Sequence, residues 1–314
     1  YVPFWRYLNL LTIPFFILTP IYFYVMDSRM VEPEDGYYEL GMIFFSRSAP
    51  RRWSKIKQVY LGWLVKAFFL PLMLIYFQGN IERFITQDLS QVNSFRRFFD
   101  SAYYLIFTVD LAYVVLGYSF SLRLFDSHIR STEPTTTGWF VALMCYQPFW
   151  SLVEKSYLQY ATPKGWGWYF GGNPVMYKIW GSIILCLLVI YSLSTVMFGL
   201  KFSNLTHRGI ITSGPYRFTK HPAYVSKNFS WWLISMPFLL GGSAIECVRR
   251  SCLLLILNFV YYLRAKTEER HLRQDPVYQN YQRFIDNKGI FRALKKPNSK
   301  IEFHSLPDRD VVFK

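Results

Sequence analysis

The sequence has few charged residues for its length and few cysteines. Only 18% of its 314 residues are charged, whereas soluble domains carry about 25%. The four cysteines lie in apolar stretches, with no Cys-x-x-Cys pair and no spacing typical of zinc ligands, so we expect no metal site and interpret them as small core residues. Low-complexity segments and repeats of fixed period are also absent from the sequence, which excludes disordered, collagen-like and repeat proteins.

Acidic residues are the scarcer of the charged residues. There are 20 Asp and Glu against 35 Lys and Arg, which gives a formal net charge of +15. Such a surplus of basic residues is typical of proteins that bind a polyanionic partner or a membrane surface. Because the sequence contains no soluble module in which basic and aromatic residues alternate, we expect a membrane and no nucleic-acid partner.

Apolar residues make up 52% of the chain and are concentrated in long runs. A helix needs about 20 mostly apolar residues to cross the bilayer core, because its backbone polar groups find no water there. The runs predict an all-α fold, a polytopic transmembrane helical bundle of about seven spans. The four long windows are 7–26, 59–77, 103–122 and 179–200, and the three shorter ones are 138–153, 228–245 and 252–263. Each of the shorter ones, taken alone, could instead be a re-entrant or interfacial segment.

The distribution of basic residues predicts the orientation of these spans. With seven spans, one side of the membrane collects 25 Lys and Arg and the other side collects 9. Without the window 138–153 the division becomes 21 to 13, so seven spans fit the sequence better. The positive-inside rule then places the C-terminus in the cytoplasm.

Two ionisable residues, Lys66 and Asp110, fall inside predicted spans. A charge at the bilayer centre costs about 2.5 kcal/mol or more, so each is a candidate functional residue. The structural alternatives are equally good. Lys66 can extend its ammonium toward the cytoplasm, and Asp110 can accept hydrogen bonds from neighbouring tyrosines.

The loop before the sixth predicted span ends in His221-Pro222. Gly214-Pro215 predicts a turn, and Pro222 suits the first position of a helix. His221 is therefore expected at a helix entrance, where free N–H groups and the helix dipole favour a carboxylate or phosphate. Arg217 and Lys220 lie close to it in sequence. The alternative is a juxtamembrane segment with basic anchors.

The last predicted span continues into a charged segment, 261–285, which we interpret as a cytoplasmic amphipathic extension of the same helix. At 100° per residue, four polar residues share one face: Tyr261, Arg264, Glu268 and His271. A charged stripe is usually a solvated face, but this one begins at membrane depth. A hairpin of the last two spans can bring His221 close to Glu268 and Glu269.

These residues resemble the motifs of a known family. The order is Gly-Pro-Tyr-Arg-x-x-Lys-His-Pro-x-Tyr at 214–224, then an apolar hairpin, then Arg-x-x-x-Glu-Glu-x-x-Leu at 264–272 and Tyr-x-x-Tyr at 278–281. The pattern resembles the isoprenylcysteine carboxyl methyltransferase family and the related phospholipid methyltransferases, over residues 209–285. The sequence departs from the family at 225–227 and 274–276, which bears on the wall of the cofactor pocket and on the substrate.

The resemblance implies an integral, multi-pass membrane enzyme that binds S-adenosyl-L-methionine at the cytoplasmic boundary and methylates a lipid or lipid-linked acceptor. Residues 1–170 would form an N-terminal transmembrane region that could select the substrate, 171–290 the methyltransferase core, and 291–314 a basic cytoplasmic tail. The candidate cofactor-binding residues are Tyr216, Arg217, Lys220, His221, Pro222, Tyr224, Glu268 and Glu269. The candidate catalytic residues are Arg264, Glu269 and His271.

The candidate cofactor-binding residues have the chemistry that this cofactor needs. A helix entrance with His221 or Arg217 suits its carboxylate, and Glu268 can accept hydrogen bonds from its ribose hydroxyls. The rings of Tyr224 or Trp232 would attract its sulfonium.

The acceptor is less well defined by the sequence. A carboxylate acceptor is already ionised at neutral pH and needs no general base, so alignment and partial desolvation would do most of the catalysis. Arg264 could hold such a carboxylate with two hydrogen bonds. An amine acceptor would have to lose a proton, for which Glu269 or His271 is a candidate base.

Other functions compete with carboxyl methylation of a lipid-linked group. Within the same class, the acceptor could be an amine or hydroxyl of a phospholipid or other lipid head group. A sterol-reductase-type oxidoreductase has a related C-terminal hairpin, but the Glu268-Glu269 pair favours a methyltransferase. Lys66 and Asp110 motivate a non-enzymatic transporter, although the sequence lacks the two related halves typical of transporters. The oligomeric state is not predicted.

Overall fold

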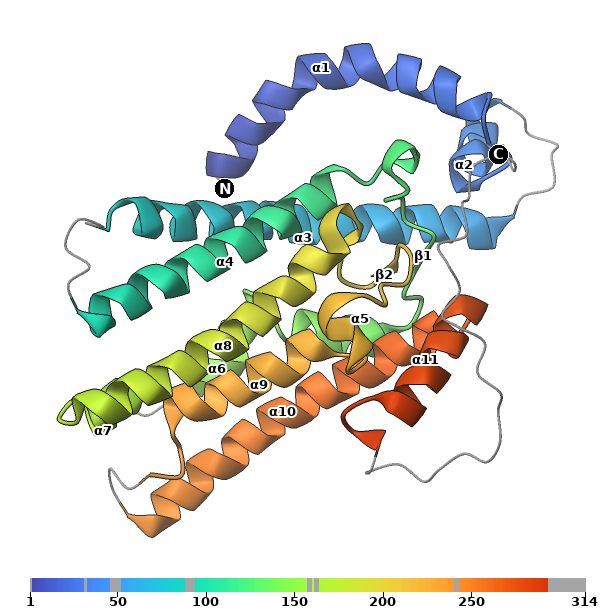
Figure 1. Ribbon diagram of the computed structural model, residues 1–314. Coiled ribbons are helices and arrows are strands. Elements are labelled where there is room, and N and C mark those ends of the chain that lie inside the picture. The colour runs from blue at the N-terminus through green and yellow to red at the C-terminus, as the bar shows by residue number, and fades with distance from the viewer. Residues whose placement is uncertain are drawn as a thin grey trace. The chain divides into compact units, whose positions relative to one another are not determined.

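The computed structural model describes most of the chain, and the described residues are mostly helical (Figure 1). The described residues are 2–30, 33–45, 52–87, 94–156, 160, 164–239 and 243–292. The predicted basic tail, 291–314, lies outside them beyond residue 292. The chain divides into two compact units: the first is 1–87, 111–136 and 199–209, and the second is 88–110, 137–198 and 210–314.

The first unit combines long helices with a minimal pair of strands. Its elements are α1 (Val2–Asp27), α2 (Gly36–Phe45), α3 (Trp53–Ile85), the end of α4 (Phe95–Ser119), β1 (Ser131–Thr132) and β2 (Thr206–His207). The two strands pair antiparallel, with Thr132 opposite Thr206. The Gln58 side chain of α3 accepts a hydrogen bond of 2.6 Å from the Thr132 N–H, which ties this pair to the helix.

A buried arginine organises the loops of the first unit. Arg208 is 2% exposed, and its guanidinium donates to the carbonyl oxygens of Gly117, Ser127 and Phe202 at 2.6–2.8 Å. Carbonyls near a helix C-terminus have no partner within the helix. Arg208 therefore satisfies the end of α4 and holds it beside the loop that carries Phe202.

The second unit contains the start of α4 and seven further helices. They are α5 (Thr136–Leu143), α6 (Phe149–Ser156), α7 (Trp166–Phe170), α8 (Pro174–Phe198), α9 (Pro222–Ser235), α10 (Ala244–Leu272) and α11 (Pro276–Lys288). Helix α9 lies along α8 on one side and along α10 on the other (Figure 1). Buried Ile184 and Leu188 of α8 and Leu254 and Leu257 of α10 belong to the two cores that hold these helices together.

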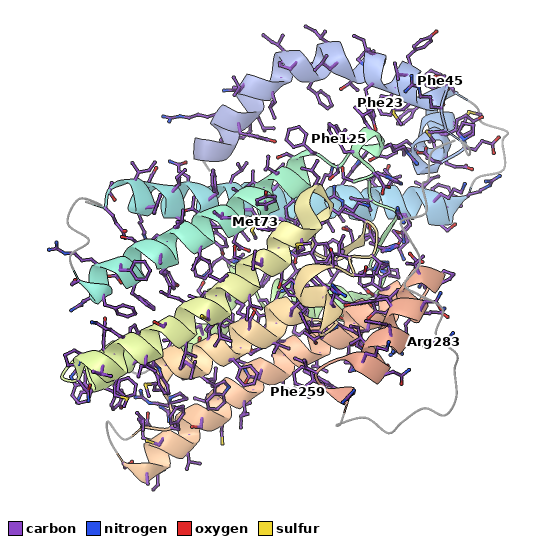
Figure 2. The ribbon with its side chains drawn as sticks, viewed as in Figure 1. Phe23, Phe45, Met73, Phe125, Phe259 and Arg283 are labelled. Carbon is purple, nitrogen blue, oxygen red and sulfur yellow. The ribbon has the colours of Figure 1, made fainter. Side chains whose placement is uncertain are left out.

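Among the described residues, four helices are long and apolar enough to cross a membrane. They are Trp5–Asp27, Trp53–Ile85, Phe95–Ser119 and Pro174–Lys201. Three of them contain the corresponding long window of the sequence and extend beyond it, and α4 begins before the third window but ends three residues before its predicted end. Many of their apolar side chains point outward, as Phe23 of α1 does with 51% exposure (Figure 2). The apolar core of a bilayer would cover this surface, whereas its exposure to water would be unfavourable.

The predicted span 138–153 is wrong as a single helix. The structure divides it into α5 and α6, of eight residues each, around a turn that contains Gln147-Pro148. Proline has no backbone N–H and disfavours helical geometry at the residue before it, which accounts for the interruption. At 1.5 Å per residue each helix is about 12 Å long, too short to cross a bilayer core of about 30 Å.

The last two predicted spans fall on α9 and α10, with different bounds, and neither helix is among the four that are long and apolar enough to cross a membrane. Helix α9 ends at Ser235, before Pro237, and α10 is one continuous helix of 29 residues rather than a 12-residue span with an extension. The helix predicted over 261–285 is also interrupted, because α10 ends at Leu272. Asp275 then caps α11 by accepting a 2.8 Å hydrogen bond from the Val277 N–H.

The interpretation of the cysteines as core residues is wrong for two of them. Cys186 of α8 and Cys252 of α10 are exposed, whereas Cys145 and Cys247 are partly buried. A thiol on a lipid-facing helix surface lies in an apolar environment, as a thiol in the protein core does. The two kinds of cysteine therefore have the same apolar neighbours in the sequence.

We expect Gly117→Ala to destabilise the first unit. A Cβ at this position would lie 2.5 Å from the Phe202 carbonyl oxygen, which cannot move without loss of its bond to Arg208. A cost of about 1–3 kcal/mol is typical of such overpacking. Thermal unfolding in detergent measures it. Gly79→Ala is the matched control, because a Cβ added there would meet no atom within 4 Å and alanine favours the helix. Equal melting temperatures for the two variants would contradict this prediction.

Candidate active site

The structure confirms that His221 lies at a helix entrance. It occupies the N-cap of α9, and Pro222 is the first helical residue. The preceding chain turns at Gly214, which has a φ of +59° and begins the short 3₁₀ helix η4 (Gly214–Arg217). The His221 ring stacks on Tyr224, one turn into α9, with centroids 5.5 Å apart and planes at 8°. This stacking directs the imidazole toward α10.

Glu269 of α10 is the centre of a buried ion-pair cluster. Its Oε1 lies 2.9 Å from Lys220 Nζ and 3.2 Å from His221 Nε2, and its Oε2 lies 3.3 Å from Lys266 Nζ and 3.6 Å from an Arg273 nitrogen. The Glu269 side chain is only 4% exposed, so these interactions are weakly screened by water. The predicted approach of His221 to Glu269 across the hairpin is therefore observed.

Glu268 belongs to a second, adjoining cluster. It accepts hydrogen bonds from the Tyr224 hydroxyl and, at 3.3 Å, from Arg264 Nε, while His221 Nδ1 lies 3.9 Å away. The Arg264 guanidinium lies 5.2 Å from the centroid of Tyr224 and 5.3 Å from that of Tyr146. A side chain held on two rings and a carboxylate has little freedom, so Arg264 fixes the position of Glu268 and Tyr224.

The polar stripe of α10 is not a solvated face. Tyr261, Arg264 and His271 are 3%, 4% and 6% exposed. A buried charged group needs hydrogen-bond or ion-pair partners. For the stripe these partners include Tyr224 of α9, which donates to Glu268, and the Arg264–Glu268 pair within α10. The burial of these three residues agrees with the expectation that the stripe is more than a solvated face, and their role in a functional site stays a prediction.

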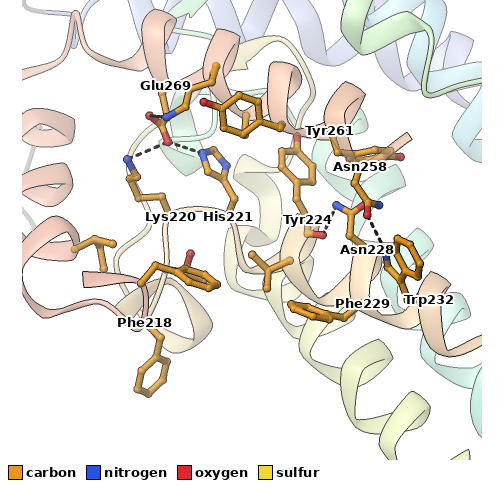
Figure 3. A pocket seen from close by; sticks show the side chains of 17 residues that line it. Phe218, Lys220, His221, Tyr224, Asn228, Phe229, Trp232, Asn258, Tyr261 and Glu269 are labelled. Atoms are coloured by element: carbon orange, nitrogen blue, oxygen red, sulfur yellow. Dashed lines mark hydrogen bonds and ion pairs between the residues drawn. The ribbon is translucent and has the colours of Figure 1, made fainter. Parts of the chain in front are cut away.

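A cavity of about 420 Å³ lies beside these clusters (Figure 3). Four candidate residues line it, namely Lys220, His221, Tyr224 and Glu269. The other candidates are not among its lining residues: Tyr216, Arg217, Pro222, Arg264, Glu268 and His271. Cavities of about 300–1,000 Å³ hold most small ligands, so this one is large enough for a cofactor or part of an acceptor.

Some of the candidates outside the cavity have other contacts. Arg217 is exposed, and Tyr216 is buried in a core with α11, where the Tyr281 hydroxyl donates a 2.7 Å hydrogen bond to the Tyr216 carbonyl oxygen. Tyr278 belongs to the same core, and burial raises its pKa. The Tyr-x-x-Tyr pair of the family pattern therefore holds α11 against η4.

The sequence did not indicate two asparagines of the cavity wall. Asn228 of α9 and Asn258 of α10 line it together with Trp232, and the two amides are hydrogen bonded to each other at 2.7 Å. Asparagine within an apolar run is uncommon, and this is the signal that could have indicated both residues.

Asp110 of α4 is 2% exposed, and the side chains of Thr195 and Tyr191 of α8 hydrogen bond to its carboxyl group, but its Oδ1 has no hydrogen-bond partner. Neighbouring hydroxyls therefore satisfy the carboxyl group only in part, and its role stays a prediction. Lys66 belongs to the first unit, and its pairing with Asp110 is not tested. Within the described ranges no group of three or more His, Cys, Asp and Glu could hold a metal ion.

The charge on Glu269 makes stability depend on pH. Burial alone raises the pKa of Glu269, but hydrogen bonds and charges from His221 and Lys220 outweigh it and hold the pKa well below the usual range. A lowered folded-state pKa means that stabilisation is complete above the unfolded pKa of about 4.3 and is lost as the pH falls. We expect the melting temperature to fall below about pH 4.3, and to fall less in Glu269→Gln. If the melting temperatures of the wild type and of Glu269→Gln fell equally with pH, Glu269 would not be the source of the pH dependence.

The fold and the site together define a class of protein, a helical membrane protein whose ionic site lies where two adjacent helices meet. Residues 176–274, from α8 to just beyond α10, match the model of the isoprenylcysteine carboxyl methyltransferase (ICMT) family. The match contains His221 and Glu269 and confirms the resemblance found in the sequence. The protein is therefore a membrane methyltransferase. No curated protein and no solved structure shows significant similarity to the chain.

Proposed function

We propose that the protein uses S-adenosyl-L-methionine to methylate the carboxylate of a lipid-linked acceptor at the cytoplasmic boundary of a membrane. The observation that supports this most directly is the position of the Lys220–His221–Glu269 cluster. It lines the cavity, lies at the start of α9 and falls within the segment that matches the family.

The charges around the cavity fit the cofactor. Lys220, Lys266 and Arg273 lie around Glu269, with Asp286 3.7 Å from Lys220, and the free N–H groups of α9 add positive potential at this end. These groups would hold the cofactor's carboxylate, and the Tyr224 ring would attract its sulfonium. When bound, S-adenosyl-L-methionine supplies a methyl group. Its transfer breaks a C–S bond, forms a C–O bond on the acceptor and moves no proton.

The same cluster favours a carboxylate over an amine as the acceptor. A general base must take up a proton, yet its ion pairs hold the pKa of Glu269 well below the usual range. The other candidate base, His271, is buried and does not line the cavity. A carboxylate acceptor needs neither residue as a base. In this proposal Arg264 is a positioning residue, which acts through Tyr224 and Glu268.

The topology that accompanies this proposal has six spans. They are the four long apolar helices and the α9–α10 hairpin, in which α9, with 14 residues, is about 21 Å long and α10 has 29 residues. The helices α5 and α6, of eight residues each, are left out. With these six, the side of the membrane that holds the C-terminus carries 21 Lys and Arg against 13 on the other side. The active site and the C-terminus are therefore cytoplasmic with either six or seven spans. Cysteine labelling of loops in sealed vesicles would test the count.

Incubation of the purified protein with methyl-labelled cofactor and a fractionated lipid extract tests the function. We expect label in a base-labile methyl ester, identified by mass spectrometry. Label in an amine or ether would show head-group methylation instead. Binding of a reduced nicotinamide cofactor without binding of S-adenosyl-L-methionine, measured by calorimetry, would show an oxidoreductase.

A further inference from the structure

The loop before α9 and the chain that follows α11 together form an exposed apolar patch, which consists of Phe218, Ile290 and Phe291. Their side chains are 59%, 59% and 39% exposed. The Ile290 N–H donates a 3.0 Å hydrogen bond to the Phe218 carbonyl oxygen, so the two segments lie side by side although they are distant in the sequence. Phe218 and Phe291 also line the cavity, and the apolar patch therefore adjoins it.

Gly289 allows these two segments to meet. A Cβ at this position would lie 2.9 Å from the Phe218 carbonyl oxygen and 2.6 Å from the Ile285 carbonyl oxygen, which is too close for any other residue. The helix that precedes Gly289 is itself held in place, because Tyr278, Tyr281 and Ile285 of α11 are buried in one core. The apolar patch therefore has a fixed position in the fold.

The α9–α10 hairpin indicates the depth of the apolar patch in the membrane. His221, at the start of α9, lies 3.2 Å from Glu269, three residues before α10 ends at Leu272. Phe218 therefore lies at the end of the hairpin that the proposed topology places at the cytoplasmic boundary. At this depth a side chain meets lipid head groups and the first carbons of the acyl chains.

Exposed apolar surface continues from the hairpin to the apolar patch. Phe229 of α9 is 57% exposed and lines the same cavity, eight residues from His221 and so about 12 Å deeper along the helix. In Figure 3, Phe218 and Phe229 lie toward the same edge of the cavity, opposite Glu269. The apolar patch is therefore an extension of a surface that the bilayer covers, rather than an isolated apolar spot in water.

Three basic residues flank the apolar patch. Arg217 precedes Phe218, Lys288 is the last residue of α11 and Arg292 follows Phe291, and all three are exposed. The carboxylate of Asp286, in the last turn of α11, faces Lys220 at 3.7 Å. Apolar side chains among exposed cations are typical of a surface that enters the head-group layer of an anionic leaflet.

The rest of the exposed surface of α11 has a different character. Gln279, Asn280 and Arg283 are exposed and polar, and they lie away from the buried face of the helix. This surface suits water. The helix therefore does not lie flat on the membrane, and only its C-terminal end is suited to contact lipid.

We propose that the apolar patch, together with Arg217, Lys288 and Arg292, binds the anionic cytoplasmic leaflet of the membrane. The apolar side chains insert at the depth of the head groups, and the cations contact the phosphate and carboxylate groups of anionic phospholipids. This inference goes beyond the proposed function, of which it uses only the topology. It implies that lipid contacts the cavity wall at Phe218 and Phe291.

Quenching of an introduced tryptophan by brominated lipid tests the insertion. Ile290→Trp, with Asn280→Trp as the matched control, is reconstituted as the full chain in nanodiscs of phosphatidylcholine and phosphatidylserine, with bromine on the phosphatidylserine acyl chains close to the glycerol. The signal of the wild type, which has ten tryptophans, is subtracted. We expect the added fluorescence of Ile290→Trp to fall at least about twofold and that of Asn280→Trp to remain. Phe291→Trp replaces Ile290→Trp if the latter does not fold. Equal quenching at the two positions, or none at Ile290, would overturn the inference.

Moving the bromine to phosphatidylcholine tests the preference for anionic lipid. At equal amounts of labelled lipid, we expect brominated phosphatidylserine to quench Ile290→Trp about fivefold more efficiently, as expected even for one basic residue near the surface. Lys288→Gln with Arg292→Gln should reduce this preference to within about twofold. Arg283→Gln, which removes a charge from the polar face of α11, should keep it. Equal quenching by the two lipids, or a preference that survives in the double variant, would contradict the proposal. These measurements involve no methyl transfer, so their outcome is independent of the cofactor and the acceptor.

Discussion

Replacement of His221 by alanine is expected to raise the Kd for S-adenosyl-L-methionine at least about a hundredfold, which corresponds to about 3 kcal/mol. His221 lies between the carboxylates of Glu268 and Glu269, with ring nitrogens 3.9 and 3.2 Å from them. Its loss removes the imidazole that faces both carboxylates beside the expected place of the cofactor's carboxylate, and removes the ring stacked on Tyr224. Calorimetry on detergent-purified protein measures the affinity.

The fold should survive His221→Ala, because an N-cap histidine makes no capping hydrogen bond that α9 would lose. His128→Ala is the matched control, since this histidine belongs to the first unit and lies outside the segment that matches the family. It should bind the cofactor as the wild type does. His221→Asn keeps a hydrogen-bond donor and should recover part of the affinity. Wild-type affinity in His221→Ala would refute the cofactor site.

The parts of this site that could be predicted from sequence are those determined by local chain geometry. Pro222 places a helix start directly after His221, and the spacing of Arg264 and Glu268 on one helix follows from the helical repeat. The approach of His221 to Glu269 also follows, because a hairpin returns to the side of the membrane from which it began. These inferences need only the order of elements along the chain.

The cavity wall could not be predicted in the same way. Asn228 and Asn258 meet because α9 and α10 pack in one particular register, and no local pattern determines that register. Arg264 and Tyr216 match the family motifs yet face Tyr146 and α11 rather than the cavity, which depends on packing between distant elements. The window 138–153 is different, because the distribution of basic residues favours a span there, whereas Gln147-Pro148 interrupts the helix locally.

Glu269→Ala is expected to abolish methyl transfer and also to destabilise the protein, unlike His221→Ala. Removing one partner of a buried ion pair costs about 3–5 kcal/mol, because the remaining charge stays buried without compensation. Lys220 is 9% exposed, and it also contacts the Asp286 carboxylate at the longer distance of 3.7 Å. We therefore expect a lower melting temperature in detergent together with loss of cofactor binding, measured on the same preparation.

A double variant separates the two effects. Glu269→Leu with Lys220→Met replaces both charges by apolar groups of similar size, so it should recover most of the lost stability and none of the cofactor binding. Glu246→Ala is the control for a carboxylate outside the site. Glu246 also pairs closely with arginines, Arg249 and Arg250 at 2.7 and 2.6 Å, but on the exposed first turn of α10. Solvent screens such pairs, so its loss should leave both measurements unchanged. Recovery of cofactor binding in the double variant would show that Glu269 serves the fold alone.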